Sequence, residues 1–150
     1  KRAAQEARQK AMEEYRATID NEFGQLPGGG TFVGTRKGMT PQESAFADEQ
    51  LALGRHVNRV PTGEGKTPDF EIDGVRTEYK GLTAVGKNTI KNNIQHANKQ
   101  AGPGGQIVID ARGFDVSRDY AFEQIRRANG NIGTLQNRVT ILTDGGPVKF

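Results

Sequence analysis

Apolar residues in this chain recur at two spacings, and the change between them divides much of the sequence into helices and strands. Intervals of three and four residues predict one helix from about Asn88 or Thr89 onward and another over residues 117–128. Short apolar runs predict buried strands over residues 106–110 and 139–142. The expected core positions are Ile90, Ile94, Ala97 and Ala101 in the first helix and Tyr120, Ile125 and Ala128 in the second.

An earlier helix is predicted from its start signal. Thr40 is a suitable N-cap, Pro41 suits the first helical position, and Glu43 stands where a capping box requires an acid or amide. Gly54 is expected to end this helix, and a strand is expected at residues 57–60. Its buried side is expected to consist of Phe46, Leu51 and Leu53.

The segment 68–80 predicts a β-hairpin. Phe70 and Ile72 alternate with acidic residues, and Asp73-Gly74 is a preferred two-residue turn. With the turn at that point, Asp69 and Glu78 lie near one another across the hairpin. Lys80 then shares a strand face with Glu78, so that two carboxylates and an ammonium converge.

The predicted order of elements is a helix, three strands, a helix, a strand, a helix and a strand. Because helical crossovers precede the last two strands, we expect an α/β (α+β) fold with a mixed central sheet flanked by helices. Residues 1–30 are expected to form a helical segment and glycine-rich linker from something upstream, and residues 31–150 to form the domain itself.

Charge and composition narrow the chemistry. The chain has no cysteine, which excludes disulfides, zinc-thiolate clusters and thiol nucleophiles, and no apolar run approaches the length of a membrane span. The net charge is +3, and Glu78 is the one acid between Arg76 and Gln100. The polar faces of the helix near residue 90 could follow a phosphate backbone. Its candidate nucleic-acid contacts are Lys87, Lys91, Asn92, Gln95 and Lys99.

The hairpin acids are candidate ligands for a hard divalent cation such as Mg²⁺ or Mn²⁺, which takes one or two carboxylates and keeps several waters. Asp69 and Glu78 are the expected ligands, and Lys80 would orient a water or stabilise charge developing on a phosphate. Glu43 is the favoured third carboxylate, and Glu49 is its alternative. A surface hairpin with a cross-strand Glu-Lys pair is the other interpretation of the same pattern.

Two further functions remain open from the residues alone. A metal-free ribonuclease would use Lys80 with His96 or His56 as acid and base on a 2′-hydroxyl. A binding module for nucleic acid or protein would use the carboxylates merely to pair with Lys80 and Arg76.

Taken in order, these elements resemble the PD-(D/E)xK nuclease superfamily and, over about Glu43 to Leu142, the C-terminal toxin domains of contact-dependent growth inhibition proteins. The residues that carry the resemblance are Glu43-x-x-Phe-Ala, Thr67-Pro-Asp-Phe-Glu-Ile-Asp-Gly74, Glu78-Tyr-Lys80, Asn88-Thr-Ile-Lys-Asn-Asn-Ile-Gln95 and Ile107-Val-Ile-Asp110.

The resemblance implies a restriction-endonuclease-like αβββαβ core and a nuclease toxin that acts on tRNA or, in some relatives, on DNA. Such a toxin would use a divalent metal, Mg²⁺ or Mn²⁺ with Zn²⁺ as a further option. It would be delivered as the C-terminal part of a larger secreted or cell-surface protein, act in the target-cell cytoplasm, and be neutralised by a cognate immunity protein.

Overall fold

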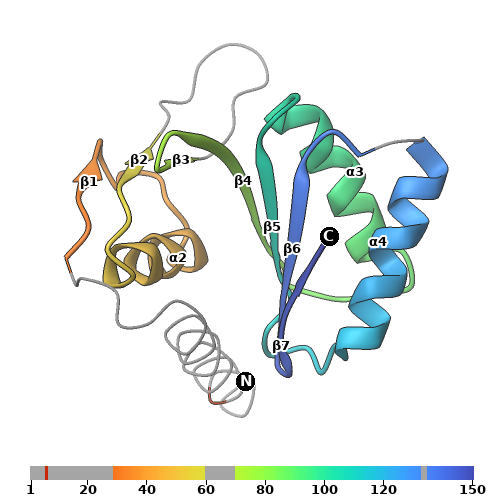
Figure 1. Ribbon diagram of the computed structural model, residues 1–150. Coiled ribbons are helices and arrows are strands. Elements are labelled where there is room, and N and C mark those ends of the chain that lie inside the picture. Colours follow the sequence, from red (N-terminus) through yellow and green to blue (C-terminus); the bar gives the residue numbers. More distant parts are fainter. Residues whose placement is uncertain (1–5, 7–28, 60–69, 133–134) are drawn as a thin grey trace.

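The computed structural model describes residue 6 and residues 29–59, 70–132 and 135–150. The described parts form one mixed sheet with helices on both faces (Figure 1). Most of the segment 1–30, for which a helix and linker are predicted, and the predicted metal ligand Asp69 lie outside the described residues. The proposed division at residue 30 therefore stays a prediction.

Seven strands make up the sheet within the described residues, and their spatial order follows the chain from β1 to β7. The parallel pairs are β1–β2, β4–β5 and β5–β6, and the other neighbours are antiparallel. The strands are β1 Phe32–Val33, β2 Val57–Arg59, β3 Phe70–Ile72, β4 Val75–Gly81, β5 Gln106–Asp110, β6 Arg138–Thr143 and β7 Gly146–Lys149.

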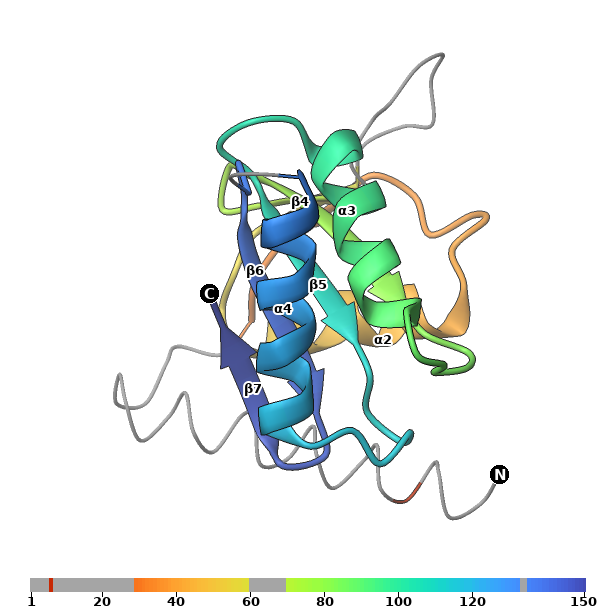
Figure 2. The same ribbon diagram turned by 90° about the vertical axis from the view of Figure 1, so that its right-hand side faces the viewer.

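Three helices in the described ranges cover the sheet: α2 (Pro41–Ala52), α3 (Thr89–Ala101) and α4 (Arg118–Ile132). Helix α2 lies on one face, and α3 and α4 lie side by side on the other, as Figures 1 and 2 show from two directions. The order from α2 to β5 is αβββαβ, so the predicted α/β class and mixed sheet are confirmed.

The core is divided by the sheet into two layers. The layer under α2 contains Phe46, Phe70 and Tyr79, and the layer under α3 and α4 contains the apolar residues of those helices with alternate residues of β5 and β6. All four core positions predicted for α3 are buried, as are Ile125 and Ala128 of α4. Burial of these side chains supplies the main driving force for packing both layers on the sheet.

The start of α2 is as predicted. The Thr40 hydroxyl accepts a hydrogen bond from Glu43 N at 3.1 Å, and the Glu43 carboxylate accepts one from Thr40 N at 2.9 Å. Phe46 and Leu53 are buried, and Leu51 packs against the same cluster. Gly54 follows the helix with a φ of 78°, a conformation that glycine adopts without steric cost.

The hairpin is also confirmed. Ile72 lies opposite Val75, and the two turn residues Asp73 and Gly74 have φ values of 50° and 82°, as a type I′ turn requires. The Asp73 carboxylate accepts a hydrogen bond from His56 N at 2.8 Å, which ties the turn to the start of β2.

The prediction that Tyr120 packs in the core is wrong, because this side chain is 37% exposed. The Ser117 hydroxyl accepts a hydrogen bond from Tyr120 N at 3.1 Å at the start of α4, and Ala121 is fully buried. With Ala121, Ile125 and Ala128 facing the sheet, a residue one position earlier is turned by about 100° from the core side. Tyr120 is therefore available at the surface.

Two strands were not predicted, β1 and β7, and both are the outermost strands of the sheet. Strand β7 contains Pro147, which edge strands tolerate because no further strand needs its missing amide hydrogen.

Candidate active site and its surroundings

Glu78 and Lys80 lie on β4, which has β3 on one side and β5 on the other. In the register with β5 they stand beside Ile107 and Ile109, so both side chains are on the α3 face. The Lys80 ammonium is 3.3 Å from a Glu78 carboxylate oxygen. The sequence therefore placed this pair correctly on one strand face.

Burial differs within the pair. Glu78 is 1% exposed, whereas 23% of the Lys80 side chain is exposed. A buried carboxylate is costly without a compensating cation or hydrogen bonds, and Lys80 supplies such a charge. The Glu78 carboxylate is thus buried on the α3 face of the sheet, next to a lysine side chain that is partly exposed to solvent.

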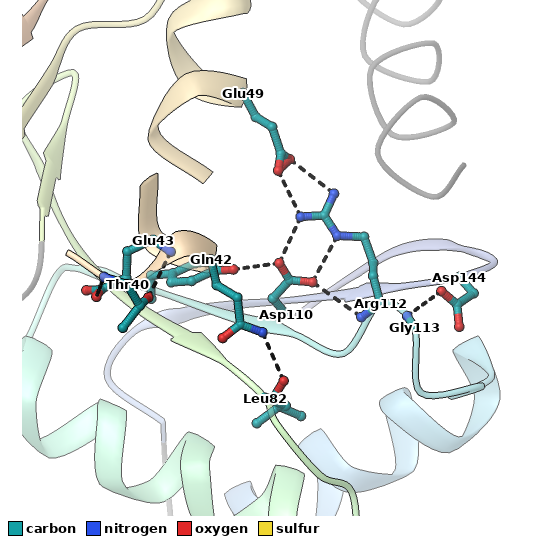
Figure 3. A network of polar contacts seen from close by, with 10 residues as sticks. Thr40, Gln42, Glu43, Glu49, Leu82, Asp110, Arg112, Gly113 and Asp144 are labelled. Atoms are coloured by element: carbon teal, nitrogen blue, oxygen red, sulfur yellow. Dashed lines mark hydrogen bonds and ion pairs between the residues drawn. The ribbon is translucent and has the colours of Figure 1, made fainter. Parts of the chain in front are cut away.

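The other predicted ligands are Asp69 and Glu43. Asp69 is outside the described residues, and β3 begins at the next residue, Phe70, opposite Thr77. Glu43 is held in the capping box of α2. Beside it, Gln42 donates a hydrogen bond to the Leu82 carbonyl at 3.0 Å, so the first turn of α2 reaches the chain just after Lys80 (Figure 3).

Gly81 makes this approach possible. A Cβ atom at Gly81 would lie 2.5 Å from the Gln42 side-chain oxygen, well inside van der Waals contact. A glycine immediately after Lys80 thus allows α2 to pack closely over the end of β4.

Glu49, the alternative third carboxylate, belongs to a buried network under α2 (Figure 3). Both of its oxygens accept hydrogen bonds from the Arg112 guanidinium, at 2.9 and 3.1 Å. Arg112 also donates two side-chain hydrogen bonds to Asp110, at 2.8 and 2.9 Å, and the Tyr79 hydroxyl donates to Asp110 at 2.6 Å. We call Glu49, Arg112, Asp110 and Tyr79 the Arg112 network.

The Arg112 network is almost completely buried. Desolvation by burial lowers the pKa of the Arg112 guanidinium, but the hydrogen bonds and charges of Asp110 and Glu49 outweigh it and raise the pKa above its usual value. The guanidinium stays charged and joins α2 to the end of β5.

Sequence reasoning missed this network. A signal was present, because Asp110 ends an apolar strand and Arg112 follows two residues later, and charged residues directly after a buried strand often serve a site at the carboxyl edge. Its partner Glu49 is 63 residues away, and no local spacing connects the two.

The candidate nucleic-acid contacts lie at the N-terminus and on the outer faces of α3, as predicted. Lys87, Asn92 and Lys99 are exposed, and Lys91 and Gln95 are partly exposed. Their role in binding stays a prediction. Both histidines, His56 and His96, are exposed.

The predicted ligands fit a hard divalent ion, since each would supply carboxylate oxygens. Within the described ranges, no three histidine, aspartate or glutamate side chains form a ready metal site. Mg²⁺ needs no such cage, because it binds through one or two carboxylates with waters completing the shell. Glu78 together with Asp69 would meet that requirement.

None of the helices in the described part of the chain is long and apolar enough to cross a membrane.

The fold and the site together define an α/β domain with a carboxylate-lysine pair on the middle strand of its sheet.

Residues 66–148 match the family described as the contact-dependent growth inhibition CdiA C-terminal domain. The match spans more than half of the 150 residues, and the chain belongs to this family. The resemblance drawn from the sequence motifs is confirmed at this level.

Among solved structures, the chain is similar to one described as the CdiA-CT/CdiI toxin and immunity complex from Burkholderia pseudomallei. The sequence identity is 16% and the TM-score is 0.48, with 81% of this chain and 98% of that chain covered. No curated protein matches the chain.

Proposed function

We propose that this domain is a metal-dependent nuclease toxin that hydrolyses phosphodiester bonds of RNA, with tRNA as the favoured substrate. The observation that carries the proposal is the pair on β4, in which buried Glu78 lies 3.3 Å from partly exposed Lys80. A carboxylate and a lysine side by side on one strand suit metal-assisted hydrolysis at a phosphate.

In this proposal Glu78 and Asp69 hold one or two divalent ions. The observed turn at Asp73-Gly74 supports this pair of ligands, because the sequence predicts that Asp69 lies near Glu78 if the hairpin turns at that point. When bound, the metal supplies Lewis-acid stabilisation of the phosphate and lowers the pKa of a bound water. Lys80 stabilises negative charge developing on the phosphate or orients the attacking water.

Glu43 is retained as the assisting carboxylate. The first turn of α2 reaches the end of β4 through Gln42, the residue before Glu43, and this contact supports a role for Glu43 at that end of the strand. By contrast, both oxygens of Glu49 already accept hydrogen bonds from Arg112. Glu43 has a capping role as well, and a glutamate can combine the two because a carboxylate accepts several hydrogen bonds.

The basic side chains of α3 would hold the substrate backbone. Lys80 and α3 share one face of the sheet, with exposed Lys87 at the start of the helix and Lys99 near its end. Positive charge next to a site of phosphate chemistry favours a polyanionic substrate.

Family membership supports the biological setting. We propose that the domain is delivered as the C-terminal part of a larger protein into competing bacteria, acts in the cytoplasm of the target cell, and is neutralised by an immunity protein in the producing cell. Exposed basic residues such as those of α3 attract acidic partners, so an acidic immunity protein would be captured quickly.

The test is cleavage of total tRNA and of plasmid DNA, with and without EDTA, followed by restoration of Mg²⁺, Mn²⁺ or Zn²⁺. We expect chelator-sensitive cutting of tRNA that Asp69→Ala and Glu78→Gln abolish. Glu71→Gln is the matched control, because Glu71 is an acid on the neighbouring strand that lies opposite Arg76.

The alternatives give different outcomes in the same assay. Chelator-resistant cutting of RNA with cyclic-phosphate ends would replace the proposal with an acid-base ribonuclease. Cutting of plasmid alone would make the domain a DNase. Full activity in both Asp69→Ala and Glu78→Gln would remove the metal site.

A further inference from the structure

A second feature of the α3 side is a surface pocket of about 440 Å³. It is lined by the loop between β4 and α3, at Val85 to Lys87, and by the loop from β5 into α4, at Phe114 to Ser117 with Tyr120. Both loops leave the carboxyl ends of adjacent parallel strands, where α/β folds commonly bind ligands. The volume lies in the range of roughly 300–1,000 Å³ that is usual for small-ligand sites.

The lining combines aromatic rings with polar groups. Phe114 is partly buried against the core, and Tyr120 is 37% exposed. Lys87 contributes a cation, Ser117 a hydroxyl and Asp115 a carboxylate to the same pocket. A planar ligand with a polar edge and an attached anion fits this set of groups better than a purely apolar or purely anionic one.

Both walls are held in position by hydrogen bonds. On one side, Arg127 donates to the Lys87 carbonyl at 3.2 Å and to the Asn88 side chain at 2.7 Å. On the same side, Gly86 N donates to the Thr89 hydroxyl at 2.8 Å.

On the other side, the Asp144 carboxylate accepts hydrogen bonds from Gly113 N at 2.7 Å and Asp115 N at 3.0 Å. Asp115 has a φ of 56°, a conformation uncommon for a residue other than glycine. The Asp144 carboxylate thus holds the loop that carries Phe114 in a set shape. A pocket formed in advance reduces the ordering cost of binding.

We infer that this pocket binds a single unpaired nucleotide of the substrate, with the base against Phe114 and Tyr120 and the flanking phosphate at Lys87. The inference rests on the proposed function and adds to it a place where an unstacked base is held. Single-stranded RNA is commonly bound by stacking its bases on aromatic side chains. The Asp115 carboxylate would accept from an exocyclic amino group, so bases that carry one bind more tightly than uracil.

The experiment uses 5′-mononucleotides, which contain no phosphodiester bond and cannot be cleaved. Binding of AMP, GMP, CMP and UMP to the full chain is measured by NMR titration, with ribose 5-phosphate as the probe that lacks a base. We expect the mononucleotides to bind at the pocket and ribose 5-phosphate to bind much more weakly.

Three variants locate the base. Tyr120→Ala is expected to weaken binding by roughly 5- to 150-fold, the usual effect of losing one base-aromatic stack. Tyr120→Phe keeps the ring and is expected to keep binding. Phe122→Ala is the matched control, because Phe122 is an exposed aromatic of the same helix that does not line the pocket.

The outcomes separate this inference from the proposed function. Tyr120-dependent nucleotide binding by a chain that never cuts RNA would support the pocket and overturn the proposed RNA cleavage. RNA cleavage together with equal nucleotide binding by Tyr120→Ala and Phe122→Ala would support the nuclease and overturn the pocket. Ribose 5-phosphate binding as tightly as the nucleotides would likewise overturn it.

Discussion

The two faces of the sheet use the same chemical groups in opposite ways. Under α2, the Arg112 network joins a guanidinium to two carboxylates and a tyrosine hydroxyl, and each of these residues is at most 3% exposed. On the α3 face, Glu78 is equally buried but its cation, Lys80, reaches the surface. The fully buried Arg112 network can only hold elements of the fold together. The Glu78-Lys80 pair has one partly exposed charge, Lys80, which can contact a ligand.

The largest expected effect on stability is in the Arg112 network, on the α2 face of the sheet. Arg112→Met would leave Glu49 and Asp110 as neighbouring buried carboxylates without their shared cation, and the free energy of unfolding should fall by about 3–5 kcal/mol. Urea unfolding measures it. Arg126→Met, which breaks the exposed pair with Glu123, should change stability by about 0–1 kcal/mol. Equal effects of the two variants would contradict a structural role for the network.

On the α3 face we expect a mutation to change catalytic activity more than stability. Lys80→Met is expected to lower the rate of RNA cleavage by about 10²–10³-fold, the usual effect of removing one group that stabilises transition-state charge. Its effect on unfolding should be smaller than that of Arg112→Met, because it takes a cation from one buried carboxylate, Glu78, rather than from two. Lys149→Met on edge strand β7 serves as the control, and wild-type cleavage by Lys80→Met would refute the assignment.

Tyr79 probes the closed network without removing a charge. Tyr79→Phe keeps the ring that stacks on Phe46 at 4.4 Å but deletes the hydrogen bond to Asp110. We expect a loss of about 1.5–3 kcal/mol of unfolding free energy, as for hydrogen bonds to charged groups, with cleavage unchanged. Tyr120, which is 37% exposed, gives the comparison, since Tyr120→Phe should leave the urea midpoint unchanged.

The smallest expected effect concerns Glu43, which lies where α2 approaches the end of β4. Glu43→Gln retains the capping box, because glutamine can also accept from Thr40 N, and stability should change by less than about 0.5 kcal/mol. The loss of charge should lower cleavage by roughly tenfold if the residue assists the site. Asp48→Asn on the same helix is the control, and unchanged cleavage in Glu43→Gln would leave Glu43 as a cap alone.

Local patterns predicted most elements correctly where a regular spacing or a specific turn signal was present. Helix α3 and strand β5 agree with their apolar patterns, and the Asp73-Gly74 turn sets the register that puts Glu78 and Lys80 together. Tyr120 was misplaced because a helical spacing with several apolar residues fits more than one phase, and the choice depends on what α4 packs against. Strands β1 and β7 are short and lie at the edges of the sheet, where few residues are buried, so the sequence shows no clear apolar pattern there.

By itself, the sequence determined the family, the αβββαβ order and the strand that carries the Glu78-Lys80 pair, because each depends on neighbours along the chain or on ordered motifs. The tertiary structure decided that Glu49 is committed to Arg112, and that Lys87 and Tyr120 line one pocket. Those contacts join residues from separate elements, and they exist because the parallel strands of the sheet bring distant loops to one edge. The local spacing of residues along the chain does not predict such contacts.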